Sequence, residues 1–179
     1  MKVLALLGST RENGNSEYLA KKIVKGTEHT LVKLSDLRIE HIVDQRHAEG
    51  GFSPVDDDYE QLVQHMLSHD VFLFATPLYW YGMSGPMKDF FDRWSQYLRD
   101  ERFHLKEELA RKKAYVVISG GSSAKVKGLP LVQQFQYIFD FVGMKFADYI
   151  IGSGVKPGEV KEDILALAKA EQWNGLFLK

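Results

Sequence analysis

Two kinds of segment alternate along the chain: short apolar runs, and longer stretches in which apolar residues recur at helical spacing. The runs at residues 71–75 and 115–118 show no alternation of polar and apolar positions. This is expected of strands that are covered on both faces. The sequence therefore predicts strands at residues 2–7, 30–34, 71–76, 114–119 and 146–151.

Each stretch between or after these strands has one apolar face, which predicts a helix. The third begins directly after Pro86, a residue suited to the first turn of a helix. The last and weakest pattern consists of Ile164, Leu165, Leu167 and Ala168. The other four faces are Leu19, Ile23 and Val24; Tyr59, Leu62, Val63, Met66 and Leu67; Met87, Phe90, Phe91, Trp94 and Leu98; and Val132, Phe135, Ile138, Phe139 and Val142.

Strands that alternate with helices predict an α/β fold with a parallel sheet and helices on both faces. The length of 179 residues suits one domain, and we expect a single domain over residues 1–179. Ligands of such sheets bind beyond the carboxyl ends of the strands, where the strand order reverses. The residues that follow strands one, three and four are therefore the first candidates for a functional site.

Composition excludes several classes of function. The chain has no cysteine, which rules out disulfides, zinc–thiolate sites, iron–sulfur clusters and thiol catalysis. Its 23 basic residues balance 24 acidic ones, so it lacks the basic surface of a nucleic-acid binder. The apolar N-terminal run is shorter than a secretory signal, and no run approaches the ~20 residues that span a bilayer. We expect a cytoplasmic protein.

The loop at residues 8–16 follows the first strand and precedes a helix, and it has the composition of a phosphate cradle. Gly8 and Gly14 permit close backbone approach, the helix offers free N–H groups, and Arg11 adds a positive charge. It matches neither a Walker A loop nor a Rossmann fingerprint. Its side-chain donors are Ser9, Thr10, Asn15 and Ser16. The alternative is an ordinary helix with Asn15 or Ser16 as N-cap and nothing bound.

Two further loops reach the same corner of the predicted sheet. Residues 77–86 carry three aromatic rings and a methionine in a place where loops are normally polar, which favours contact with a flat heteroaromatic ring. The rings could instead pack on the next helix or on a dimer partner. After strand four, Gly120 and Gly121 can turn backbone N–H groups towards a ligand, or form an ordinary tight turn.

The remaining candidates are weaker. The irregular segment 35–56 is either filler or a loop that faces a substrate or partner. Lys88, Asp92 and Arg93 on the third helix are either structural or part of a dimer surface. We expect no metal site: His65 and His69 are four positions apart but lack a third ligand, and the acidic run 56–58 is typical of a helix N-terminus. His47, in the long loop, either faces a substrate or is an exposed imidazole without a role.

Together the three loops resemble the NAD(P)H-dependent FMN reductases of the flavodoxin-like superfamily. The most specific parts are Gly-Ser-Thr-Arg-x-x-Gly-Asn-Ser at 8–16, and Pro77-x-Tyr79 leading to Gly85-x-x-Lys88-x-x-x-Asp92-Arg93. The resemblance covers essentially the whole chain and implies a three-layer sandwich around a five-stranded parallel sheet in the order 2-1-3-4-5. Iron–sulfur members of this group carry a cysteine cluster after strand two, whereas this chain has none.

By position, the resemblance implies FMN as cofactor. The implied phosphate ligands are Ser9, Arg11, Asn15 and Ser16. Pro77, Leu78, Tyr79 and Trp80 would line the ribityl chain and isoalloxazine, and Gly120 and Gly121 would approach the pyrimidine edge. No catalytic acid or base is expected, since the flavin carries the redox chemistry.

The resulting hypothesis is an FMN-dependent oxidoreductase, and we expect at least a homodimer. Hydride would pass from NAD(P)H through FMN to a small acceptor: a quinone, a flavin, an azo or nitro compound, or a ferric chelate. The alternative is a flavodoxin-type electron carrier without nicotinamide activity; the net charge of −1 argues against it, because such carriers tend to be strongly acidic. An empty fold with a structural role is a third possibility.

Overall fold

The computed structural model describes residues 1–179 and contains a five-stranded parallel sheet in the order β2-β1-β3-β4-β5. The strands are β1 Val3–Leu7, β2 His29–Lys33, β3 Val71–Pro77, β4 Lys113–Gly120 and β5 Lys145–Ser153. All five expected strands are confirmed, with small differences at their ends. The order reverses between β1 and β3, because the chain places β2 on one side of β1 and the later strands on the other.

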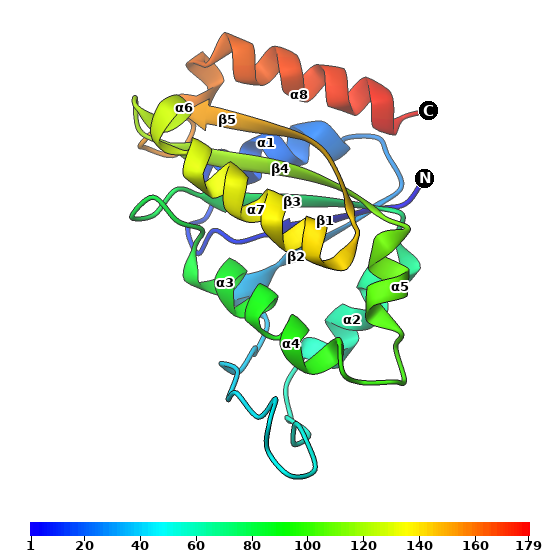
Figure 1. The fold of residues 1–179 in the computed structure, drawn as a ribbon. Helices are drawn as coiled ribbons and strands as arrows, with labels where there is room; N and C mark the ends of the chain where they lie inside the picture. The colour runs from blue at the N-terminus through cyan, green and yellow to red at the C-terminus, as the bar shows by residue number, and fades with distance from the viewer.

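Helices cover both faces of this sheet (Figure 1). Helices α1 (Asn15–Val24) and α8 (Ile164–Phe177) pack side by side on one face. The helices that contribute to the core on the other face are α2 Tyr59–Ser68, α3 Gly85–Asp92, α4 Trp94–Tyr97, α5 Leu105–Ala110, α6 Ala124–Lys127 and α7 Leu129–Val142. Short 3-10 turns occur at Leu34–Asp36 and Glu159–Glu162.

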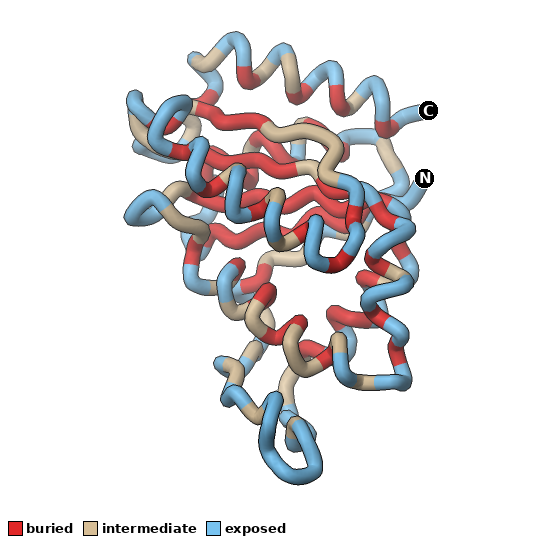
Figure 2. The backbone as a smooth tube through the Cα atoms, viewed as in Figure 1, coloured by how far each residue is buried: buried red, intermediate tan, exposed pale blue.

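The central strands are buried on both faces, as their unbroken apolar sequence predicts (Figure 2). Because side chains alternate along a strand, β3 supplies Phe72 and Phe74 to the core beneath α7, and Leu73 to the core beneath α1 and α8. Phe74 contacts the ring of Phe139 in α7, with ring centroids 5.3 Å apart. The sheet is thus held rigidly between two apolar layers.

Two helix predictions need correction. The third apolar face was expected to form one helix, but the structure divides it at Arg93 into α3 and α4. The side chain of Arg93 turns inward there to meet a buried carboxylate. The helix expected near residue 164 is present, but its predicted face is wrong, because Ile164 and Leu165 are 78% and 75% exposed. The buried face of α8 consists of Ala166, Ala170, Trp173 and Phe177.

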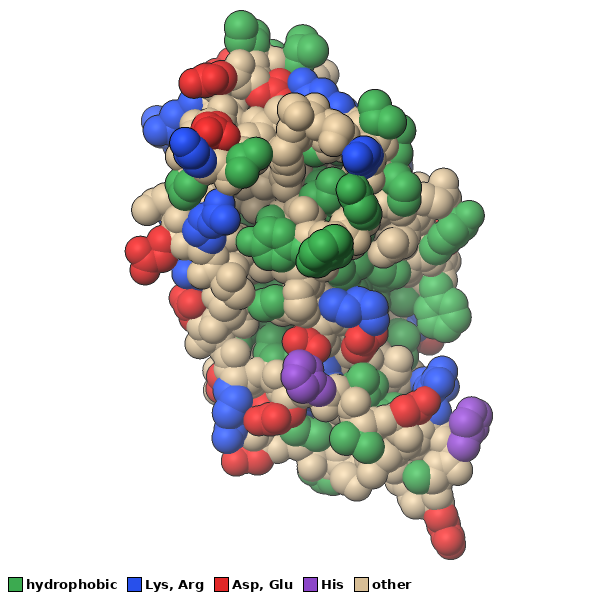
Figure 3. Space-filling model, turned by 90° about the vertical axis from the view of Figure 1, so that its left-hand side faces the viewer, with side chains coloured by type: hydrophobic (Ala, Val, Ile, Leu, Met, Phe, Trp, Pro, Cys, Tyr) green, Lys and Arg blue, Asp and Glu red, His purple; other side chains and the backbone are tan.

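The chain termini and the candidate loops lie at opposite edges of the sheet. Both termini lie at the amino edge, where the strands begin (Figure 1). The opposite, carboxyl edge carries the loops that follow β1, β3, β4 and β5, and apolar side chains gather across the middle of this face with basic side chains beside them (Figure 3). None of the helices has the length and apolar character that a membrane crossing requires.

Candidate cofactor-binding site

Four loops at the carboxyl edge enclose a cleft of about 160 Å³ at the point where the strand order reverses. This is smaller than the roughly 300–1,000 Å³ of typical ligand pockets, so the cleft can enclose one end of a ligand and leave the rest over its rim. Its lining consists of Ser9, Arg11, Gly14, Asn15, Ser16, Pro77, Leu78, Tyr79, Ser119, Gly120, Gly121, Gly154 and Val155. Of the cofactor-binding residues that the resemblance implies, only Trp80 is absent from this lining, and of the residues expected in the phosphate cradle Gly8 and Thr10 are absent.

The loop after β1 leaves the start of α1 open. Its N-cap is Gly14, which has no side chain to bond the first-turn N–H groups, so neither Asn15 nor Ser16 caps the helix as the alternative reading required. A Cβ atom at Gly14 would lie 2.9 Å from the Oγ atom of Ser9. A side chain at this position would therefore displace the Ser9 hydroxyl, and the open helix terminus favours an anion.

Arg11 links this loop to the one after β5. Its Nη1 atom donates a hydrogen bond of 2.9 Å to the carbonyl oxygen of Val155, and its backbone N–H donates to the Oγ atom of Ser9. Arg11 is exposed at the rim of the cleft, and the guanidinium has five N–H donors. Donors therefore remain for a ligand.

The side chain of Asn15 forms hydrogen bonds with other residues of the protein. Its Nδ2 atom donates to the carbonyl oxygen of Lys156 at 3.0 Å, and its Oδ1 atom accepts from the N–H groups of Gly158 and Val160. A Cβ atom at Gly154 would lie 2.7 Å from Asn15 Nδ2. The amide of Asn15 thus fixes the wall after β5, and Nδ2 donates only one of its two N–H groups within the protein.

Two residues that the sequence did not single out, Gly154 and Val155, also line the cleft. The signal was available, because residues 152–155 read Gly-Ser-Gly-Val directly after the fifth strand. Loops after every parallel strand reach the same edge of a sheet, so this loop belonged among the candidates.

The loop after β3 contains a two-residue turn made of aromatic residues. Tyr79 and Gly82 exchange backbone hydrogen bonds of 3.0 and 2.9 Å, and the central residues Trp80 and Tyr81 have φ angles of 48° and 65°. Such turns favour Asn-Gly, since a left-handed conformation costs about 1–2 kcal/mol for other residues. The Trp80 side chain is 97% exposed. The turn therefore holds a large ring in solvent beside the cleft.

The loop after β4 is packed closely against its neighbours. A Cβ atom at Gly120 would lie 3.0 Å from the Cβ atom of Ala124 and 3.2 Å from that of Leu78. The carbonyl oxygen of Gly120 accepts from Gly154 N–H at 2.7 Å, and that of Ser119 accepts from Leu78 N–H at 2.7 Å. Gly120 thus joins three loops of the cleft.

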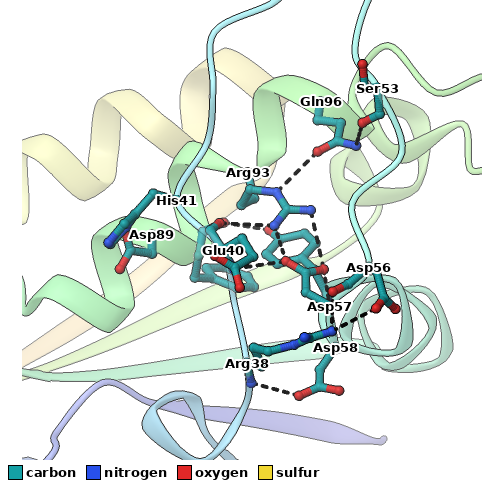
Figure 4. A network of polar contacts seen from close by, with 12 residues as sticks. Arg38, Glu40, His41, Ser53, Asp56, Asp57, Asp58, Asp89, Arg93 and Gln96 are labelled. Carbon is teal, nitrogen blue, oxygen red and sulfur yellow. Dashed lines mark hydrogen bonds and ion pairs between the residues drawn. The ribbon is translucent and has the colours of Figure 1, made fainter.

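The long loop between β2 and α2 is anchored by a buried ion pair (Figure 4). Arg93 contacts Asp57, and the two side chains are 1% and 0% exposed. Arg93 also donates to the carbonyl oxygen of Glu40 at 3.1 Å and lies 4.8 Å from the ring centre of Tyr59. Burial opposes the charge of Asp57, but the Arg93 guanidinium and backbone N–H groups outweigh it and lower the pKa of Asp57. Of the two roles considered for Arg93, the contacts support the structural one.

Other polar candidates from the sequence form local contacts. Lys88 and Asp92 form an exposed pair 2.5 Å apart on α3. The imidazole of His69 contacts the carbonyl oxygen of His65 and the hydroxyl of Thr30. In the acidic run, Asp57 does bond the first N–H of α2, at Tyr59, but its main partner is Arg93. None of these contacts reaches the cleft.

Comparison with known proteins agrees with the fold. A family model for the flavodoxin-like fold matches residues 1–175. YwqN of Bacillus subtilis, which carries the name of an NAD(P)H-dependent FMN-containing oxidoreductase, is 47% identical over 173 residues that cover 96% of each chain. The iron–sulfur flavoprotein MJ1083 of Methanocaldococcus jannaschii is 25% identical over 95% of this chain and 92% of its own. The solved structure of a Trp repressor binding protein from Bacillus subtilis has 43% identity and a TM-score of 0.81, and covers 96% of this chain and 99% of its own.

Proposed function

Because the chain belongs to the flavodoxin-like family, and its relative YwqN is named for this activity, we propose that it is an NAD(P)H-dependent FMN oxidoreductase. It would pass hydride from a nicotinamide nucleotide through bound FMN to a small acceptor. The observation that carries the proposal is the open N-terminus of α1 beside Arg11, in a cleft at the reversal of strand order.

The cleft has the donor chemistry of a terminal phosphate site. The first turn of α1 offers backbone N–H groups without a side-chain cap, and the hydroxyls of Ser9 and Ser16 lie beside it. Arg11 supplies the positive charge that a dianion requires. No Rossmann fingerprint for a pyrophosphate is present, which favours FMN over FAD. Asn15 would act by fixing the wall after β5.

The remaining residues orient the cofactor. Pro77, Leu78 and Tyr79 would flank the ribityl chain and the ring, and Gly121, where a Cβ atom would meet only Val155 at 3.6 Å, leaves room for the pyrimidine edge. FMN, when bound, supplies the hydride chemistry. The protein's part is to hold the ring at the open rim, where a donor and then an acceptor can reach it. No side chain is needed as an acid or base.

The acceptor belongs to the small electrophiles named above: quinones, flavins, azo or nitro compounds, and ferric chelates. We also propose a cytoplasmic homodimer with the flavin near the interface. The exposed rings of Tyr79, Trp80 and Tyr81 support the dimer, since interfaces are enriched in such residues.

Purification, a visible spectrum and a turnover assay test the proposal. We expect a yellow protein that releases FMN on heating, and that oxidises NADH or NADPH in the presence of a quinone. A protein that binds FMN but shows no nicotinamide oxidation with any acceptor would be an electron carrier instead. A protein that stays colourless after FMN reconstitution would overturn the cofactor assignment.

A further inference from the structure

A second cavity, of about 220 Å³, adjoins the cofactor cleft. The two share Leu78 and Gly121 in their walls. The rest of its lining is Trp80, Tyr81, Ser123, Ala124 and Lys127. It contains two aromatic rings, one hydroxyl and one positive charge, and no carboxylate. Its size suits a single aromatic ring with a substituent, since a cavity of about 150 Å³ can hold benzene.

The two aromatic residues that line this cavity have a strained backbone conformation. Trp80 and Tyr81 both adopt positive φ angles, which bulky side chains rarely do. The 97% exposure of Trp80 means that packing within the chain does not account for the conformation. Strained residues of this kind concentrate at ligand-binding sites. The turn therefore presents the two rings to something outside the fold.

The charge of Lys127 has no partner in the fold. Its ammonium lies 5.5 Å from the ring centre of Tyr81, and it forms no ion pair. By contrast Lys125, on the same short helix, is paired with Asp163 at 2.9 Å. Lys127 is thus held over the cavity by an aromatic ring and is free to meet an anion.

We propose that Trp80, Tyr81 and Lys127 form a subsite for a planar aromatic group that carries a negative charge, on the reactant that exchanges hydride with the flavin. This inference rests on the proposed function and identifies the chemistry of its second reactant. Two sources offer that chemistry: the phosphorylated nucleotide donor, and an anionic aromatic acceptor. In either case the ring stacks on Trp80 while the anion meets Lys127.

The matched variants for the test are Lys127→Met and Lys106→Met. Lys106 lies 5.4 Å from the ring centre of Phe141, so it makes the same kind of contact, but on α5, which precedes the start of β4. Both variants remove one positive charge and one cation–π contact. Only Lys127→Met changes the cavity, so Lys106→Met controls for the loss of charge itself.

The first readout is ligand binding to the FMN-loaded protein without turnover. Trp80 is 97% exposed, whereas Trp94 and Trp173 are 3% and 1% exposed, so quenching of tryptophan fluorescence by the neutral quencher acrylamide reports on Trp80. The probes are NADP⁺, NAD⁺, 1,4-naphthoquinone-2-sulfonate and neutral 1,4-naphthoquinone. At least one anionic probe should protect Trp80 from acrylamide in the wild type, and about 1.5- to fivefold more of it should be needed in Lys127→Met.

The second readout is the steady-state KM for NADPH, NADH and the two quinones. It distinguishes a nucleotide donor in the subsite from an anionic aromatic acceptor. A donor in the subsite raises KM for NADPH, NADH or both in Lys127→Met and leaves both quinones unchanged. An acceptor raises KM for the sulfonated quinone alone. Either result supports the subsite.

The inference is overturned if no probe protects Trp80 or if Lys127→Met behaves as Lys106→Met does. It is also overturned if Lys127→Met weakens the binding of charged and neutral quinones equally. Failure of the proposed function has a different signature, because the wild type would then bind no FMN or oxidise no NAD(P)H.

Discussion

Arg93 and Asp57, which are 36 positions apart in the sequence, form an ion pair that is almost completely shielded from solvent. The pair joins the long loop after β2 to the end of α3, and Gln96 strengthens it by accepting from Arg93 Nε and donating to the carbonyl oxygen of Ser53. A loop with little regular structure of its own is thereby fixed against the helix that follows the aromatic turn.

Replacement of Arg93 by Ala should lower the free energy of unfolding by about 3–5 kcal/mol, because it leaves the carboxylate of Asp57 buried without its partner. Urea denaturation followed by circular dichroism measures the change. Lys88→Ala is the control: it breaks the exposed pair with Asp92 and should cost about 0.3–0.5 kcal/mol. Equal losses in the two variants would contradict the role assigned to Arg93.

The ion pair of Arg93 and Asp57 should make the free energy of unfolding depend on pH in the acidic range. The pKa of Asp57 is lowered in the folded protein, so its stabilising effect is present above the unfolded value of about 3.9 and is lost as the pH falls through the folded value. We expect the unfolding free energy of the wild type to fall more steeply below about pH 4 than that of Asp57→Asn. Parallel pH profiles for the two proteins would show that Asp57 does not contribute.

Replacement of Arg11 by Ala should weaken FMN binding about 10- to 150-fold, since a hydrogen bond to a charged group contributes about 1.5–3 kcal/mol. The protein should stay folded, because Arg11 is exposed. Fluorescence titration of the apoprotein with FMN measures the affinity. Glu12→Ala changes the neighbouring exposed residue and should leave the affinity unchanged. Unchanged affinity in Arg11→Ala would remove Arg11 from the phosphate site.

The double substitution Trp80→Asn/Tyr81→Gly should raise the free energy of unfolding by about 1–3 kcal/mol, because Asn-Gly suits the left-handed conformation of this turn. The control, Trp80→Ala/Tyr81→Ala, also removes both rings but retains residues with a Cβ atom, so it should relieve little strain. Thermal and urea unfolding compare the two. If the free energy of unfolding rises as much in the alanine variant as in the Asn-Gly variant, relief of backbone strain does not explain the increase.

The FMN-loaded protein should sediment at micromolar concentration as a species well above the chain mass of 20.5 kDa. The exposed rings at 79–81 would border the interface, with the Trp80 ring still accessible to ligands, so Trp80→Asp should shift the protein towards the monomer. A wild type that sediments at the chain mass with full activity would contradict the dimer and restrict these rings to small ligands.

Sequence patterns predicted what depends on local periodicity and position. The two-sided burial of β3 follows from its unbroken apolar run, and the rule that ligands bind beyond parallel strands located three loops of the cleft. The inward turn of Arg93 could not be predicted, because its partner Asp57 lies in a loop without regular structure. The buried face of α8 was missed, since Ala166 and Ala170 carry a weak hydrophobic signal and the strongly apolar Trp173 and Phe177 lie beyond the predicted pattern, which ends at Ala168.

The placement of Asn15 shows a different limit of sequence reasoning. An asparagine in a glycine-rich loop before a helix is an obvious ligand, yet its amide bonds the segment 156–160 near the other end of the chain. Only the fold brings these segments together. The same residue types shape a site and contact its ligand. Only their positions in the folded structure distinguish the two roles.

The position of the two termini at the amino edge, opposite the cleft, bears on how the protein can be handled. An affinity tag or a covalent tether attached at either end would extend away from the four loops. A protein fixed to an electrode or a bead by such a tether would turn its flavin-side face, with Trp80 at the rim, towards the solution. Immobilisation through surface lysines would lack this orientation, because Lys127 lies on the face that must stay free.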